Sequence, residues 1–562
     1  MKELYIDMME KVVGAYTDSH IRRYTAEVKE HGLAEHGFPR LTANLGILIA
    51  HGRKQELKKD FIEMMNLCCS EIPTARTRNG NRVGNDFSVR EIVFCILELE
   101  KAGTFNKTIT DGWRDALSKI NPYLTYSRIA GYPPKPLGNW AAFGAASEQL
   151  RKYARIGDES FFIENQIASQ FHAFDANGMY RDPHEPIVYD LAPRIQLAVA
   201  LYYGFQGEGA EILVEELLKS ADKTLYMQSV TGEIPFGGRS NQFLHNEALY
   251  AALCEFYAVL FKKRNDAKKS GMFKRAARIA TESILPWLDE TPIPHIKNFY
   301  PTDSMYGCEK YAYYDKYMVT TASWLYLAHA ISDDTICEVS CPSESENYIW
   351  ETSPYFHNTA LKFGDYLVQL DTSAVEEYDA SGIGRIHRRG APSAICLSVP
   401  FSKTPNYSLD IENPSPLSMC GGIKINDSFI YSYGKDTVYT LKTKEVTDEF
   451  VKYAYECENE NGLKLEQTCI VSESGVELRA EGSGEVEILL PLFDFDGKNH
   501  TEKSVTKKSA AVTYKGWKCI YTTDGKLVTK EKVYANRNGH YNLVAAHGKN
   551  SVTIKIEIKE IK

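Results

Sequence analysis

Apolar residues recur at helical spacing along roughly the first 330 positions of the chain. The segments between them carry turn chemistry, as in 131–138 and 291–294. Helices joined by polar, aromatic-rich loops predict antiparallel hairpins that close into an α/α toroid with the loops at its mouth. The segments with this period are 4–16, 61–67, 89–99, 140–156, 161–171, 195–205, 210–225, 247–261, 273–288 and 317–330.

The period changes after about residue 335, where short β-branched or alternating runs are separated by turn residues. A series of such strands predicts an antiparallel β-sandwich. We therefore expect an α+β multidomain chain, with an α/α toroid over residues 1–334 and a sandwich over 335–562. The predicted strands are 360–370, 394–399, 422–431, 465–471, 486–490, 517–521 and 552–558.

Composition agrees with this division, because 562 residues exceed what one core usually organises. The net charge of -9, with dispersed basic residues, argues against a nucleic-acid partner. The first ten residues hold no apolar run of signal-peptide length and no later segment spans a bilayer, so we expect a cytoplasmic protein without a membrane partner. The sequence predicts no oligomeric state.

Aromatic residues are abundant, with 35 Tyr, 24 Phe and 6 Trp. Such side chains suit a sugar-binding cleft, although a large core also accounts for them. The 12 Cys form no disulfide framework, and Cys337 and Cys341 lack a second ligand pair, so neither a metal nor a cofactor is expected.

The segment 232–250 concentrates reactive side chains at a predicted helix start. Ser240 is a plausible N-cap. Asn241 and His245 are four residues apart and would share one helical face. With Arg239 and Asn246 they suggest a site, while the alternative is that these residues are structural polars or solvated loop residues.

Further candidates lie in toroid loops or at the edge of the sandwich, and we expect them on the same rim. Asn139 and Trp140 begin a helix, and Asp182 and Asp190 share the loop 175–190. The loop 298–315 is rich in tyrosine, and the segment 382–390 is basic. These last two segments contribute Tyr300, Tyr306, Tyr311, His387 and Arg388.

Two chemistries fit these residues, and the residues alone leave both open. In β-elimination beside a uronic acid, Asn241 and Arg239 would neutralise the carboxylate and His245 would act as base or neutraliser. Tyr300 or Tyr306 would then exchange the second proton. In glycoside hydrolysis, paired carboxylates would serve, drawn from Asp182, Asp190, Glu247 and Asp303.

The predicted architecture resembles heparinase II/III- and alginate-lyase-type polysaccharide lyases. Residues 236–247 are similar to the loop-into-helix segment that carries an Asn or His in those families. Their catalytic Tyr follows some fifty to sixty residues later, and Tyr300 and Tyr306 lie 55 and 61 residues after His245. The resemblance also implies a sandwich-domain His, a role that fits His387.

A second resemblance, across about 138–260, is to the DUF2264 proteins, some of which are associated with β-glucuronidase activity. Its landmarks here are 139–140, 180–182, 189–190 and 238–240. The His-Asn-Glu segment at 245–247 departs from that family and favours the lyase, while the His-Asp metal motif of many heparinase II/III sandwiches is absent from the sequence. Both resemblances imply a uronic-acid-containing oligosaccharide as substrate. We expect a lyase first, a glycoside hydrolase second, and a non-catalytic sugar-binding protein third.

Overall fold

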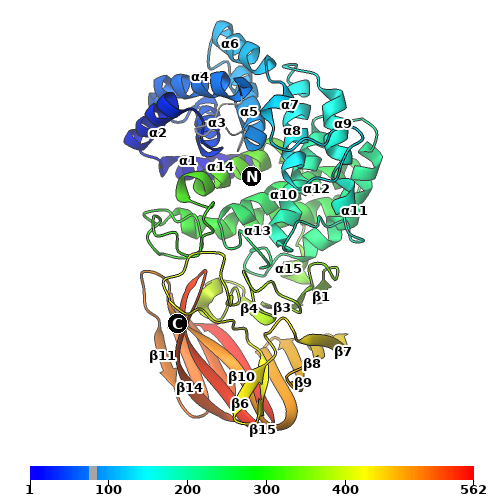
Figure 1. Ribbon diagram of the computed structural model, residues 1–562, viewed down its shortest axis with the longest axis vertical. Helices are drawn as coiled ribbons and strands as arrows, with labels where there is room; N and C mark the ends of the chain where they lie inside the picture. Colours follow the sequence, from blue (N-terminus) through cyan, green and yellow to red (C-terminus); the bar gives the residue numbers. More distant parts are fainter. Residues whose placement is uncertain (75–84, 562) are drawn as a thin grey trace.

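A computed structural model describes residues 1–74 and 85–561, and it shows helices followed by antiparallel sheets (Figure 1). The predicted fold class is confirmed. No helix in these two described ranges carries an apolar stretch long enough to cross a bilayer. The α-helices are α1 Lys2–Gly14, α2 Asp18–His31, α3 Gly37–Ala50, α4 Lys58–Thr74, α5 Val89–Ala102, α6 Lys107–Ser118, α7 Pro122–Thr125, α8 Trp140–Tyr153, α9 Ser160–Ala168, α10 Ile187–Tyr202, α11 Ala210–Tyr226, α12 His245–Lys263, α13 Ala267–Leu288, α14 Tyr314–Ile331 and α15 Pro342–Ser345.

Alternate helices form a closed inner ring. Helices α3, α5, α8, α10, α12 and α14 pack in this order, and α14 packs back against α3. The ring helices are buried nearly all round, as α3 shows with every residue but the last one buried. The outer helices α1, α4, α9, α11 and α13 pack against the ring, and α2 and α6 are buried along one stripe only, as expected for amphipathic surface helices.

The sheet region contains a four-stranded sheet and an 11-stranded sheet. The small sheet has the order β1-β2-β3-β4. The large one runs β11-β12-β13-β15-β10-β9-β8-β7, with β14 beside β15 and the β5–β6 hairpin beside β10. The strands are β1 Tyr348–Glu351, β2 Asn358–Phe363, β3 Tyr366–Asp371, β4 Gly382–Arg388, β5 Gly421–Ile425, β6 Ser428–Tyr431, β7 Val438–Val446, β8 Phe450–Glu458, β9 Lys464–Ser472, β10 Gly475–Phe495, β11 Glu502–Val505, β12 Ser509–Tyr514, β13 Trp517–Thr523, β14 Lys526–Asn536 and β15 Gly539–Glu560.

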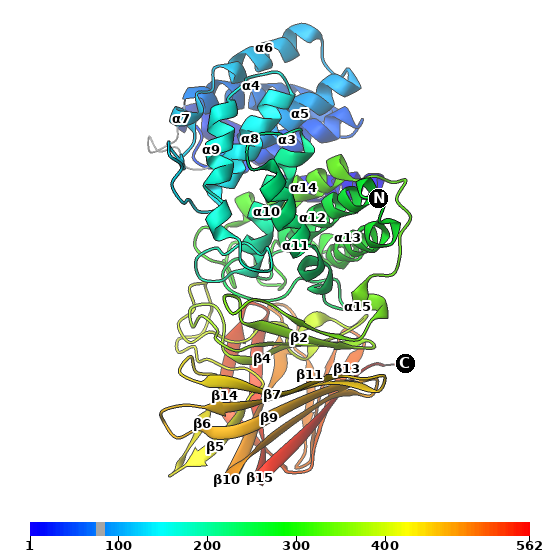
Figure 2. The same cartoon turned by 90° about the vertical axis from the view of Figure 1, so that its right-hand side faces the viewer.

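The small sheet is a middle layer between the helices and the large sheet (Figure 2). Successive strand residues point to opposite faces, and every residue of β2 and β3 is buried. Ala360 and Leu367 join the core of the helical region, whereas their neighbours Leu361 and Val368 join the core of the sandwich. Both faces are therefore packed. We keep the division between residues 334 and 335 as a proposed domain boundary, since the long helices end at Ile331.

Three of the predicted strands differ in detail from the structure. The run 360–370 is a hairpin, because Gly364, with φ of 52°, turns β2 into β3. The run 422–431 is likewise the β5–β6 hairpin, turned at Asn426 with φ of 55°. A tight turn within an apolar run does not interrupt the pattern, so each hairpin was predicted as one strand. The run 394–399 forms a 3-10 turn, Ser393–Ile395, and one isolated bridge.

Candidate active site

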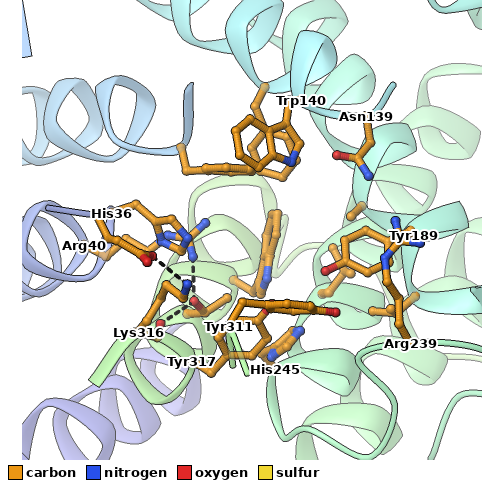
Figure 3. Close-up of a pocket in the computed structure, with 18 residues that line it drawn as sticks. His36, Arg40, Asn139, Trp140, Tyr189, Arg239, His245, Tyr311, Lys316 and Tyr317 are labelled. Carbon is orange, nitrogen blue, oxygen red and sulfur yellow. Dashed lines mark hydrogen bonds and ion pairs between the residues drawn. The ribbon is translucent and has the colours of Figure 1, made fainter. Parts of the chain in front are cut away.

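The inner ring encloses a pocket of about 390 Å³, which is a size typical of small-molecule sites (Figure 3). Each ring helix contributes at or beside its first turn: Arg40 from α3, Phe87 just before α5, Trp140 from α8, Tyr189 from α10, His245 from α12 and Tyr317 from α14. The N-terminal ends of the ring helices therefore meet at the pocket. Their partial positive charges favour an anionic ligand.

One wall of the pocket carries His36, Arg40 and Lys316 (Figure 3). Arg40 is 3% exposed; its Nη1 donates to Thr320 Oγ1 (2.5 Å), while its buried Nε has no hydrogen-bond partner. Burial lowers the pKa of Arg40 to about 10, so the guanidinium remains charged at neutral pH. Lys316 Nζ donates to Glu35 Oε2 (2.6 Å).

Arg239 lies on the opposite wall, with Asn139 and Tyr189 (Figure 3). Its guanidinium is paired with Asp182 Oδ2 and lies 4.6 Å from the centre of the Tyr189 ring. Asn139 Nδ2 donates to the other carboxylate oxygen of Asp182 (2.8 Å). Burial raises the pKa of Asp182 and the charge of Arg239 opposes this shift. Both Asp182 oxygens are thus engaged by donors.

Aromatic rings form the remaining surfaces, with Trp140 and Tyr311 on opposite sides of the pocket (Figure 3). The hydroxyls of Tyr189 and Tyr311 lie 3.1 and 3.0 Å from Ser240 Oγ. Burial raises the pKa of Tyr311 and of Tyr317, so both remain protonated and can donate. Flat rings with hydroxyl groups at their edges suit a sugar ligand.

His245 is a neutral imidazole in this pocket. Its ring stacks on Phe243 (centroids 5.5 Å apart) and meets Tyr317 edge-on (5.2 Å). Its Nδ1 is buried without a hydrogen-bond partner among the described residues. Burial first, and the charge of Arg40 second, lower its pKa to about 3. The ring therefore has a lone pair available at neutral pH.

The prediction of a helix starting at Ser240 was wrong, since α12 begins at His245. Ser240 and Gln242 have φ of 57° and 67°, outside the right-handed helical region, so the helix cannot run through them. The Ser240 N–H donates to Glu309 Oε1 (2.6 Å) and fixes this irregular turn. Asn241 and His245 therefore do not share a helical face, and Asn241 is not part of the pocket lining.

Comparisons with known proteins show similarity at low sequence identity. The chain resembles heparan sulfate lyase HepC from Pedobacter heparinus, at a TM-score of 0.46 and 11% identity over 93% of this chain and 76% of that one. A mutant of the same lyase matches at a TM-score of 0.45 and 10% identity, over 92% of this chain and 76% of that one. A glycosyl hydrolase family 88 protein from Bacteroides vulgatus matches at a TM-score of 0.38 and 10% identity, over 59% of this chain and 99% of that one. The predicted resemblance to polysaccharide lyases is confirmed as a resemblance, and it assigns no residue a role.

No protein-family model matches the chain. A curated relative, the phosphomevalonate dehydratase large subunit of Thermococcus kodakarensis, is 24% identical over 162 residues. This match covers 29% of the chain and 38% of that protein, so the chain spans about two fifths of the relative's length.

The structure brings several predicted site residues together. Asn139, Trp140, Arg239, His245 and Tyr311 line one pocket although they lie far apart in the sequence. Asp182 adjoins them through its contacts with Asn139 and Arg239.

Four predicted residues near α10 and α12 are instead held in buried contacts outside the pocket. Asp190 is fully buried and paired with Arg194. Glu247 is paired with Lys297 (2.9 Å), and Asn246 donates to the Ser240 carbonyl (3.1 Å). Asn241 accepts from the Gln242 side chain (3.0 Å). Asn246 and Glu247 point into the protein because the first turn of α12 is buried on all sides.

The predicted tyrosines of the 298–315 loop also lie elsewhere. Tyr300 and Tyr306 stack on each other (centroids 3.5 Å apart) beside the sandwich, where Tyr306 bridges to Ser408. Asp303, on the same loop, is exposed. Their separation from His245 in sequence matched the lyase families, but the loop carries only Tyr311 to the pocket.

The predicted sandwich residues do not reach the pocket. His387 lies in β4 and contacts Ser229 Oγ (2.8 Å) and Ser398 Oγ (3.1 Å), and burial lowers its pKa. Arg388 donates to the Ile558 carbonyl (2.5 Å) and lies over the Trp517 ring. Both residues belong to the packing between the small sheet and its neighbours.

Sequence reasoning missed Arg40, His36, Lys316 and Tyr317. A signal was present for Arg40, because it is the one charged residue in the mostly apolar stretch 37–50. A charged residue among buried apolar positions is rarely placed there without a partner or a ligand. Among residues 1–74 and 85–561, no group of three or more His, Cys, Asp or Glu side chains is arranged to hold a metal ion.

Proposed function

We propose that this chain cleaves glycosidic bonds at uronic-acid residues of oligo- or polysaccharides by β-elimination. The pocket combines aromatic walls with cationic side chains, a combination that suits an acidic sugar. Its size suits a short stretch of sugar units rather than a macromolecular surface.

The residues supply the three functions that the reaction needs. Arg239 and Asn139 would face the carboxylate of the sugar and stabilise the charge that develops when the proton at C5 leaves. The neutral imidazole of His245 would accept this proton. A protonated tyrosine, which we assign as Tyr311, would give its proton to the oxygen that leaves C4, and the C4–C5 double bond would form.

One observation carries the choice of elimination over hydrolysis. Each carboxylate at the pocket is already engaged by a basic group: Asp182 by Arg239 and Glu35 by Lys316. His245, by contrast, is neutral and has a ring nitrogen without a partner. A free base beside protonated phenols supports proton abstraction, whereas hydrolysis needs a pair of working carboxylates.

The test is incubation with glycosaminoglycan, alginate, glucuronan and pectic oligosaccharides, followed by mass spectrometry and ultraviolet absorbance. Elimination gives an unsaturated fragment that absorbs, and hydrolysis gives a fragment heavier by one water. We expect His245→Gln and Tyr311→Phe to lose about 10²–10⁴-fold in kcat. Tyr306→Phe is the matched control and should retain activity, because Tyr306 lies outside the pocket. Cleavage without the absorbing product would exclude the proposal.

A glycoside hydrolase is the second candidate, and the raised pKa of Asp182 favours it. A buried carboxyl with a raised pKa suits a general acid. This alternative predicts that heavy oxygen from labelled water enters the released reducing sugar, and that Asp182→Asn abolishes cleavage. Binding of an oligosaccharide that stays intact would instead identify a non-catalytic sugar-binding protein.

A further inference from the structure

The wall of the pocket that carries His36, Arg40 and Lys316 holds a surplus of buried positive charge. Arg90, in the neighbouring helix α5, is paired with Glu91, and Arg40 Nε lies 3.8 Å from the same carboxylate. One glutamate therefore faces two buried arginines. Lys316 is matched by Glu35, so the unmatched charge is that of Arg40.

Polar atoms on this wall are also left without partners. Arg40 Nε and His36 Nδ1 are both buried and make no hydrogen bond among the described residues, and the Glu91 carboxylate lies too far from Nε to accept one. Burial first, and the charges of Arg40 and Lys316 second, hold the pKa of His36 well below its usual range. A donor on a buried guanidinium that makes no hydrogen bond is costly unless a ligand accepts one from it.

We propose that Arg40, with Lys316 and His36 beside it, forms a subsite for an oxyanion, separate from the Arg239 wall. A guanidinium presents its N–H groups in a planar fork that matches the oxygens of a carboxylate, sulfate or phosphate group. Such an anion would satisfy the open donor and balance the surplus charge. It would also favour protonation of His36, which would then donate to it.

The subsite lies across the pocket from Arg239 (Figure 3). A sugar whose carboxylate faces Arg239 therefore does not reach Arg40 with the same group. We infer that the ligand carries a second oxyanion at its other end, and this step rests on the proposed function. A free inorganic oxyanion has the same chemistry, and the experiment separates the two sources.

The probe is inorganic sulfate, measured by calorimetry and by the fluorescence of Trp140 and Trp324, which line the pocket. We expect sulfate to bind the wild type and the Arg239→Met variant, and to bind Arg40→Met at least tenfold more weakly. Glu91 keeps Arg90 as its partner when Arg40 is replaced, so the variant should fold. Arg53→Met is the control, since Arg53 pairs with Glu3, Asp7 and Glu10 on the surface.

Equal sulfate binding by the wild type and Arg40→Met, or no sulfate binding by the wild type, overturns the subsite. If Arg40→Met does not fold, Arg40→Lys replaces it. The lysine keeps the charge but loses the fork, so sulfate should raise its Tm less than that of the wild type. An equal rise in Tm for both proteins overturns the subsite as well.

Competition then identifies the source of the anion. The competition is measured in Arg239→Met with an oligosaccharide that the wild type cleaves. If sulfate and this oligosaccharide compete, the oxyanion is carried by the sugar ligand. If both bind at once, the inference of a second oxyanion on the ligand is overturned, and the subsite takes a free anion. The two proposals fail separately. If sulfate binds at Arg40 but no uronide is cleaved, the proposed function is wrong and the subsite stands. If a uronide is cleaved equally by the wild type and Arg40→Met and sulfate does not bind, the subsite is wrong and the proposed function stands.

Discussion

The protonation state of His245 is set by what surrounds this one side chain. It lies against Phe243 and Tyr317, out of water, and the charge of Arg40 acts on it from the next wall. Both effects disfavour the imidazolium, so the pKa falls to about 3. The sequence marked His245 as a candidate, but its state depends on Arg40, which is 205 positions away in the chain.

This depressed pKa predicts the pH profile of the reaction. The active form is neutral His245, which persists at every pH above its pKa of about 3. In the wild type kcat/KM should therefore stay level from about pH 8 down to about pH 5, where an ordinary histidine with a pKa near 6.5 would be mostly protonated. Steady-state rates on one oligosaccharide across this range provide the measurement. A tenfold loss per pH unit below about 6.5 would contradict the role of a buried neutral base.

At the scale of elements, the sequence predicted the helical ring and the strand-rich region because both depend on local periodicity. It did not predict how α12 begins. Ser240 matched the pattern of a helix cap, and Phe243 matched that of an apolar stripe. The segment between them is instead an irregular turn, because Glu309, 69 residues later in the chain, accepts a hydrogen bond from the Ser240 N–H. A contact between distant segments leaves no periodic signal. The same reason explains why the site was placed at Asn241 and Tyr306 as well as at His245.

The turn that carries Arg239 depends on glycine at position 238. Gly238 has φ of 72°, and a Cβ there would lie 2.7 Å from Pro186 Cα. Gly238→Ala should therefore destabilise the protein by about 2 kcal/mol or more and displace Arg239 from the pocket. Thermal unfolding is the measurement. Gly112→Ala in α6 is the control, because a Cβ there meets nothing within 4 Å; alanine should leave the Tm unchanged or raise it. Equal Tm values for the wild type and Gly238→Ala would contradict the steric argument.

At the scale of the whole molecule, the sandwich takes part in shaping the pocket. Arg537, in the turn between β14 and β15, donates to the Gly307 carbonyl (2.6 Å) and to Glu309 Oε1 (2.7 Å). Glu309 in turn accepts from the Ser240 N–H, and the Ser240 hydroxyl meets that of Tyr311. A buried chain of contacts thus links a sandwich turn to the pocket wall. The sequence placed the two regions correctly in order, but nothing local in either one predicted this link.

This link makes Arg537 and Glu309 a coupled pair. Both side chains are 2% exposed, and the Arg537 guanidinium also lies 4.0 Å from the centre of the Tyr407 ring. Arg537→Met leaves the Glu309 carboxylate buried without its cation, which typically costs about 3–5 kcal/mol. Adding Glu309→Gln removes the charge while its amide oxygen still accepts from Ser240. The double variant should therefore be more stable than Arg537→Met alone.

Unfolding of the two single variants and the double variant gives the coupling energy. The exposed pair Arg479 and Glu481 (2.8 Å) is the matched control, and Arg479→Met should change stability by less than about 1 kcal/mol. Oligosaccharide cleavage should follow the same order, since Ser240 and Tyr311 depend on Glu309. If the two single effects simply add, the contacts do not act as a unit, and the pocket wall is held by the helical region alone.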